Sequence, residues 1–573
     1  MDLYLIDAIS PFFIGNARRK TNWSKIPFDH IRPDKPEADE LWASIEAGME
    51  VFAEKVADVG YNAVSLDDVA HLAQSDHYEI EIQDQIHLYQ KRYRPIIDIL
   101  QKRGLKIYVT MDVLSYTSAL LKNVGTSTRS VTAFIKELLT DFFKTFPEVK
   151  GVIMRIGESD GLDVHNEFRS QLILKRAKQV NRLLKETLPV FEEQDRELIF
   201  RTWTVGAYGI GDLMWHRSRF IKIFQDIDSP AITISMKYGE SDFFRYLPLN
   251  SHFFRLNLPT IVELQARREY EGSGEFPSFI GEDYSQYAQE LRKAPRLRGI
   301  SVWCQTGGWT PFCRLTYIEK EGIWNEINAA VALQVFRDQV SPEAALRNFA
   351  QSHNIPNIDD FVNLMQKSEM VVKRLLYIPD IAKQKFFFRR VRIPPLLSVY
   401  WNNIFINHSL KKILMHLTKN PKACVRDGYA ALEEIELMHA HAEKCKLPVD
   451  DIEFMYDTFS ILAIAREYYY QTFDRSIRNR LKAAKKSYKN KYPKSLRPRY
   501  RIKMNFDPFP IKRRTLGWVS YVALRRQRGY RIIDRLLILH FLSTVYWVIR
   551  KRKPNIIPKF ARKSAMGIDT VFR

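Results

Sequence analysis

Carboxyl side chains occur in this sequence at spacings that suit proton transfer. Glu158 and Asp160 lie two residues apart in the segment RIGESDG, whereas Asp242 and Glu269 lie in the segments KYGESDF and ELQARREY. Two carboxyl groups on either side of a glycosidic bond act as general acid and general base in its hydrolysis. We therefore take these four residues as the candidate catalytic groups, provided that the fold brings them together.

Cationic and aromatic side chains accompany these carboxyl groups. Cations have no task in a neutral-sugar site, but an Arg fork binds a carboxylate well, and tryptophan faces stack on sugar rings. The candidate substrate-binding residues are Arg155, Arg201, Trp203, Lys237, Tyr238, Glu263, Gln265, Trp303, Gln305 and Trp309. This set favours a site for an acidic sugar. The alternative is that its cations close ion pairs with neighbouring carboxylates.

Each candidate ends or follows a short apolar segment that is typical of a buried strand. The predicted strands are 3–8, 62–66, 105–111, 151–156, 197–203, 231–236, 260–265 and 299–304, and helical patterns fall at 39–58, 85–103, 131–145, 166–190, 284–293 and 319–336. Eight such units predict an α/β fold, a (β/α)₈ TIM barrel over 1–336. Catalytic groups of such barrels lie at the carboxyl ends of the strands, as these candidates do. No glycine-rich nucleotide-binding motif follows any strand.

The second half predicts a helical domain over 337–474. It opens on Ser341, Pro342 and Glu343, a typical helix start, and helical patterns follow at 342–353, 358–376, 406–418, 424–443 and 449–474. His439 and Glu443 share a helix face but His441 does not, and two side chains rarely hold zinc. We expect no metal site and no cofactor.

Charge divides the chain. Residues 1–330 hold 41 Lys plus Arg and 46 Asp plus Glu, whereas the whole chain has a net charge of +22, so residues 331–573 carry +27. The predicted tail, 475–573, has 29 basic residues against three acidic ones. We expect a weakly structured, aromatic-rich basic arm that meets an anionic partner.

One apolar segment interrupts this tail, at 532–549, and predicts a helix. Its uninterrupted apolar run is 14 residues, short of the ~20 that span a bilayer. Two interpretations stay open: a buried core helix, or a helix on an anionic membrane surface. Nucleic acid is not expected, since no motif for it appears. The start, MDLYLIDAISPFFIG, lacks a basic signal-peptide segment, so we expect a cytoplasmic protein. If the tail binds lipid, the protein would be peripheral at the inner face of the membrane.

Residues 55–350 resemble the xylan α-glucuronidases, glycoside hydrolase family 67. The segments that carry the resemblance are YRPIIDILQKRGLKIYVTMDVLSY, FPEVKGVIMRIGESDG, LIFRTWTVG, ITISMKYGESDF and IVELQARREYEGSGE. The resemblance implies an inverting hydrolase. In it Asp242 and Glu269 match the positions that activate water, Arg201 matches the residue that binds the uronate, and Lys237 with Tyr238 matches the pair before Asp242. The following helical domain implies a homodimer.

The chain also departs from that family. It starts almost at the first strand, without the family's N-terminal β domain, and it has Arg268 and Glu240 where the family has Gln and Pro. Asp160 stands at the aligned acid position, whereas Glu158 lies nearer the strand end and has the longer reach, so either can be the acid. These changes add charge near the site and make xylan an unsafe substrate assignment.

We therefore expect a glycoside hydrolase that removes a uronic acid, or another acidic sugar, from an oligo- or polysaccharide. The alternative is a non-catalytic barrel that binds acidic glycan at the membrane surface during polysaccharide assembly.

Overall fold

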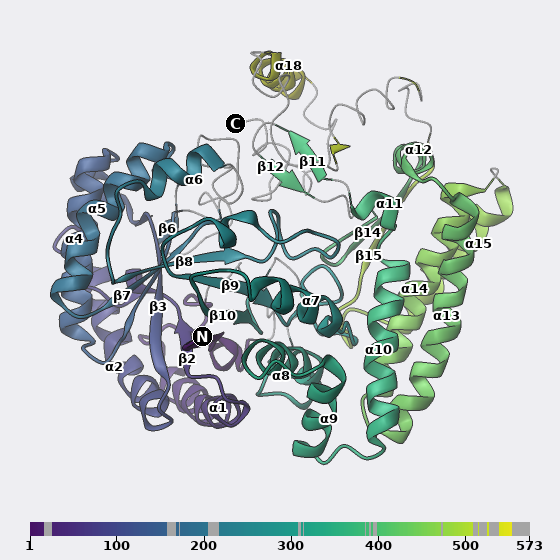
Figure 1. Cartoon of the computed structure of the whole chain (residues 1–573), viewed down its shortest axis with the longest axis horizontal. Coiled ribbons are helices and arrows are strands. Elements are labelled where there is room, and N and C mark those ends of the chain that lie inside the picture. The colour runs from purple at the N-terminus through teal and green to yellow at the C-terminus, as the bar shows by residue number, and fades with distance from the viewer. Residues whose placement is uncertain are drawn as a thin grey trace.

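The computed structural model shows the chain as a barrel followed by a helical domain (Figure 1). The residues that the structure describes are 1–16, 26–156, 168–170, 172–203, 217–307, 311–312, 314–383, 385–388, 391–393, 398–471, 474–507, 514, 524–525 and 538–552.

Eight parallel strands close the barrel, in the order β1-β10-β9-β8-β7-β5-β3-β2. The strands are β1 (Leu3–Asp7), β2 (Ala63–Leu66), β3 (Lys106–Asp112), β5 (Gly151–Arg155), β7 (Glu197–Arg201), β8 (Ile232–Lys237), β9 (Thr260–Gln265) and β10 (Leu297–Trp303). Apolar side chains such as Leu5, Tyr108, Ile153 and Ile261 fill the barrel interior as one buried cluster. The predicted TIM barrel is confirmed, with each strand within two residues of its predicted bounds.

Helices cover the outside of this barrel. They are α1 (Ala38–Val59), α2 (Ile80–Lys102), α3 (Ser118–Val124), α4 (Thr128–Thr145), α5 (Ala177–Glu193), α6 (Arg217–Phe224), α7 (Gly281–Leu291) and α8 (Ile323–Arg337). Their apolar faces pack on the strands because apolar residues recur every three or four positions, as Trp42, Ile45, Met49 and Phe52 do in α1. After β8, where no helix was predicted, the chain forms only a short 3-10 turn, η3 (Ser251–Phe254).

The helical domain lies beside the barrel, on the right of Figure 1. Its helices are α9 (Pro342–Ser352), α10 (Ile358–Leu375), α11 (Pro379–Ala382), α12 (His408–Leu417), α13 (Pro421–Lys444), α14 (Val449–Tyr470) and α15 (Arg475–Lys491). The predicted start of α9 has the expected cap, since the Ser341 hydroxyl accepts the backbone N–H of Ala344 at 3.1 Å. Short strands that the sequence did not reveal, β11 (Lys385–Phe388), β12 (Val391–Ile393), β13 (Val399–Tyr400) and β14 (Asn403–Asn407), separate α11 from α12.

The chain after 474 differs from the weakly structured arm that the sequence predicted. Helix α15 buries Ile477, Leu481 and Tyr488, and strand β15 (Arg501–Asn505) pairs in parallel with β14. The apolar residues at 477, 481 and 488 recur at helical spacing, but basic residues surround them and dominate the composition. Residues 475–507 therefore extend the helical domain past its predicted boundary at 474.

A last helix, α18 (Ile538–Arg552), corresponds to the segment predicted at 532–549. Phe541, Trp547, Val548 and Ile549 of this helix are exposed, so the interpretation as a buried core helix is wrong for these side chains. Within the described part of the chain, no helix is long and apolar enough to cross a membrane.

Candidate active site

The carboxyl ends of the barrel strands bring most of the predicted residues together. Arg155, Arg201 and Lys237 end β5, β7 and β8, Glu263 and Gln265 lie on β9, and Trp303 ends β10. Asp242 and Glu269 follow β8 and β9 in the loops after these strands, and both side chains are buried. Glu158, Asp160 and Trp309 lie outside the described residues.

Three predicted cations bind protein carboxylates. Arg155 lies 2.8 Å from Asp112, and Arg201 makes two parallel hydrogen bonds of 3.0 Å to Glu263. Burial would raise the pKa of Glu263, but Arg201 outweighs burial and holds it below its usual value. Lys237 donates to Asp242 at 2.5 Å. The ion pairs named as the alternative are therefore present.

Aromatic rings enclose Lys237. Its Nζ atom lies 3.7 Å from the ring centre of Trp203, 4.4 Å from that of Phe243 and 5.3 Å from that of Trp303. The Arg201 guanidinium also lies over Trp303, at 4.3 Å. Cation–π contacts of this kind stabilise a desolvated charge. Both tryptophans therefore hold the cations as well as lining the site.

Asp242 is tightly held. Its Oδ1 atom accepts from Lys237 and from the Phe243 backbone N–H at 3.0 Å, and its Oδ2 atom accepts from the Tyr270 hydroxyl at 2.7 Å. A carboxylate with a cation and two further donors keeps a fixed position. Asp242 is therefore held in a fixed position.

Glu269 lies in a different environment. Its Oε2 atom is buried without a hydrogen-bond partner among the described residues. Burial, together with the nearby Asp242 charge, raises the pKa of Glu269 to about 8. Glu269 therefore keeps its proton at neutral pH.

Gln265 and Gly307 complete the surroundings of Glu269. The Gln265 Oε1 atom accepts the Glu269 backbone N–H at 2.9 Å, and Gln265 Nε2 has no partner among the described residues. Gly307 has φ +139°, and a Cβ there would lie 2.6 Å from Gln265 Nε2 and 3.3 Å from Glu269 Oε2. A glycine is needed here, and it leaves a donor and a carboxyl group side by side for a ligand.

Two predicted binding residues, Tyr238 and Gln305, form hydrogen bonds within the protein. Tyr238 points away from the barrel interior, donates to the Phe244 carbonyl at 2.9 Å and stacks on Tyr287 of α7, because successive side chains of a strand face opposite sides. The amide oxygen of Gln305 accepts from Ser10 and from the Thr316 backbone, both at 3.1 Å. Both positions are structural.

Asp7, which ends β1, is not among the residues predicted from the sequence. The Asp7 carboxylate accepts the backbone N–H groups of Cys304, Gln305 and Thr306, at 2.5, 3.1 and 2.6 Å, and so fixes the loop after β10. Asp67, at the end of β2, accepts from Thr110 at 2.5 Å. Asp7 is the last residue of β1, just as Arg201 is the last residue of β7. Its place at the end of a strand was the signal in the sequence that could have identified Asp7.

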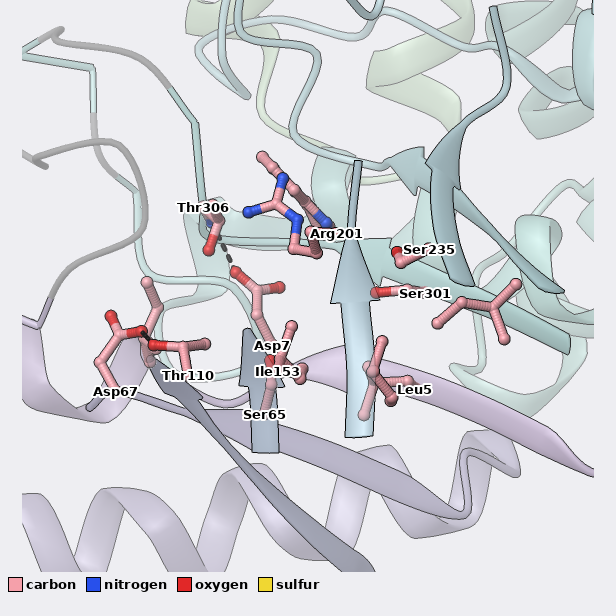
Figure 2. Close-up of a pocket in the computed structure, with 14 residues that line it drawn as sticks. Leu5, Asp7, Ser65, Asp67, Thr110, Ile153, Arg201, Ser235, Ser301 and Thr306 are labelled. Atoms are coloured by element: carbon pink, nitrogen blue, oxygen red, sulfur yellow. Dashed lines mark hydrogen bonds between the residues drawn. The ribbon is translucent and has the colours of Figure 1, made fainter. Parts of the chain in front are cut away.

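A small cavity lies between these groups (Figure 2). Asp7, Asp67, Thr110, Arg201 and Trp303 help to line it, and its volume is about 30 Å³. A single water needs roughly 10–15 Å³ of such space. The cavity therefore suits roughly two or three waters, and a sugar ring requires space beyond it.

No family model matches this chain, and no curated protein matches it. Among solved structures, a GH138 enzyme targeting pectin rhamnogalacturonan II shares 12% identity with this chain, with a TM-score of 0.49. The match covers 86% of this chain and 59% of the GH138 enzyme. An O-GlcNAc hydrolase of Thermobaculum terrenum shares 10% identity over 92% of this chain and 96% of its own, with a TM-score of 0.41. A β-glycosidase from Pyrococcus horikoshii shares 13% identity with this chain. The match covers 52% of this chain and 87% of the glycosidase, with a TM-score of 0.33.

These likenesses are too weak to carry an argument about function. The barrel rests on the strand order of this chain itself, and the resemblance to glycoside hydrolase family 67 stays a prediction.

Proposed function

We propose that this protein is a glycoside hydrolase whose reaction takes place at the carboxyl end of the barrel. The observation that carries the proposal is the pair Asp242 and Glu269. One carboxylate is anchored by Lys237 and Tyr270, and the other has a pKa raised to about 8 and an oxygen without a partner among the described residues. Two carboxyl groups in such different environments have different roles in a reaction that moves protons.

Glu269 is the group of the two that exchanges a proton. Both oxygens of Asp242 already accept hydrogen bonds, so Asp242 serves to hold Lys237 and to raise the pKa of its neighbour. A pKa near the working pH suits proton transfer. In the proposed reaction Glu269, once ionised, takes a proton from the attacking water, and Glu158 or Asp160 protonates the leaving oxygen.

The finer proposal is that the enzyme removes a uronic acid with inversion, as the family resemblance implies. Arg201 is the residue that the resemblance assigns to the uronate. Because Arg201 makes two hydrogen bonds to Glu263, binding of the substrate carboxylate there requires the guanidinium to be shared between the two carboxylates. Such a site needs Arg201, because Lys cannot bind two carboxylates in one plane.

A panel of aryl α- and β-uronides and the matching neutral glycosides tests this proposal, with the product anomer followed by NMR. We expect inverted release from an α-uronide and a loss of at least ~100-fold in kcat for Asp242→Asn and for Glu269→Gln. Glu197→Gln is the matched control, because Glu197 begins β7 at the opposite end of the barrel. Equal losses in all three variants, or turnover of neutral glycosides alone, would contradict the acidic-sugar mechanism.

The second candidate is the non-catalytic glycan-binding barrel. The paired state of Arg155, Arg201 and Lys237 favours it, since a site built for turnover usually leaves a charged group for the substrate. Binding of glucuronate measured by calorimetry, with no turnover anywhere in the panel, would select this candidate.

A further inference from the structure

Helix α18 presents an apolar face to the outside of the molecule. Phe541 is 65% exposed, and Trp547, Val548 and Ile549 are 41–48% exposed. These four are a third of the twelve exposed large hydrophobic residues among those described, on one helix of 15 residues. Single exposed apolar residues are ordinary, but a cluster of this kind marks an interaction surface.

The exposed residues share one side of the helix. Phe541 and Val548 are two turns apart in the middle of that side, with Trp547 and Ile549 flanking it. Val545 on the same side is half-buried, as are Tyr546 and Arg550 on the opposite side. Figure 1 shows α18 at the upper edge, apart from the helices of the barrel and of the helical domain. The helix therefore leaves most of its apolar face exposed, where a partner can bind.

Charge identifies the kind of partner. The last turn of α18 holds Arg550, Lys551 and Arg552, and Lys551 and Arg552 are exposed next to the apolar face. The chain from 475 on has 29 basic residues against three acidic ones. Aromatic and aliphatic residues beside a basic cluster are typical of a helix that lies in the interface of an anionic bilayer.

We propose that α18 binds the surface of an anionic lipid bilayer. Its exposed apolar face would enter the boundary between headgroups and acyl chains, and Lys551 and Arg552 would contact lipid phosphates. The helix lies in the membrane plane, since no described helix is long and apolar enough to cross. This inference is independent of the reaction proposed for the barrel.

Sedimentation of the full chain with vesicles tests the inference. We expect binding to equimolar phosphatidylglycerol and phosphatidylcholine, and little binding to phosphatidylcholine alone. The variant Phe541→Ser, Trp547→Ser, Ile549→Ser should bind at least ~10-fold more weakly. Each of Lys551→Gln and Arg552→Gln should cost roughly five-fold on the anionic vesicles, and less at high salt.

The matched control is Ile80→Ser with Leu437→Ser, which removes apolar side chains that are 73% and 52% exposed on α2 and α13. It should bind vesicles like the parent. Three results would overturn the inference. The first is equal vesicle binding by the parent and the apolar variant. The second is binding to a DNA oligonucleotide that only the basic variants lose. The third is a dimer in lipid-free ultracentrifugation that the apolar variant dissolves.

Discussion

Glu269 shows how strongly burial decides the chemistry of one residue. It differs from the exposed glutamates of the chain only in position, yet burial, together with the Asp242 charge, raises its pKa to about 8. Glu271, two residues on, is equally buried, but Arg245 and Arg268 outweigh burial and hold its pKa well below the usual value. Neighbouring glutamates of one loop thus have opposite protonation states at neutral pH.

The raised pKa predicts how stability depends on pH. The unfolded chain loses the Glu269 proton near pH 4.5, whereas the folded chain keeps it to about pH 8, so the free energy of unfolding falls between these values as pH rises. The slope from this group is at most about 1.4 kcal/mol per pH unit. Urea denaturation from pH 5 to 9 should show Glu269→Gln gaining stability relative to the parent. Parallel pH curves for the two proteins would refute the raised pKa.

The same titration should appear in catalysis. If Glu269 takes the proton from water, kcat/KM of the proposed hydrolase rises with pH up to about 8, because only the ionised form is a base. Initial rates from pH 5 to 9 measure this. A profile that falls through pH 8 would instead make Glu269 the general acid.

The loop between β9 and α7 positions Glu269 through contacts with the helical domain. Arg245 binds Glu271 at 3.0 Å and Glu369 of α10 at 3.1 Å, which ties the loop to that helix. Tyr270 lies between the two parts of the site, with its hydroxyl on Asp242 and its ring stacked on Phe244 at 4.3 Å. The helical domain therefore shapes the candidate site from outside the barrel.

Tyr270→Phe tests this positioning role. The ring stays, but Asp242 loses a donor, so its charge acts more strongly on Glu269 and raises the pKa of that carboxyl further. The pH–rate profile should move to higher pH by up to about one unit. Tyr287→Phe is the control, since the Tyr287 hydroxyl donates to the Leu247 carbonyl and has no contact with Asp242. An unchanged profile with a lower Tm would make Tyr270 merely structural.

The barrel and the helical domain are joined by buried charges. Asp451 of α14 binds Arg314 of the barrel side, Arg497 at 2.8 Å and the Trp324 indole at 2.7 Å. Glu275 lies 3.6 Å from Arg314 and 3.5 Å from Arg497. Breaking a buried pair leaves a desolvated charge without its partner. We infer that the two parts unfold together.

Asp451→Ala should lower the free energy of unfolding by about 3–5 kcal/mol. Asp359→Ala removes an exposed partner of Arg347 and should cost less than about 1 kcal/mol. Calorimetry should show one cooperative transition for the parent. Two separate transitions, or equal effects of the two variants, would contradict a joint interface.

The sequence by itself determined the barrel. Strands buried on both faces are continuous apolar runs, and parallel strands share one edge, so their ends predicted that Arg155, Arg201, Lys237, Glu263 and Trp303 meet. It did not reveal α15, whose apolar positions are hidden among basic residues. It also did not reveal the short strands after α11, of which β11 and β14 pair with distant segments.

Only the tertiary structure decided what these residues do to one another. Whether Arg201 binds a ligand or Glu263 depends on the register between β7, β8 and β9, and the proton on Glu269 depends on which charges the loops bring near it. The same holds for α18, where composition left both a core helix and a surface helix open. Burial and the distance between charges are properties of the packed chain, and no local pattern of residue types contains them.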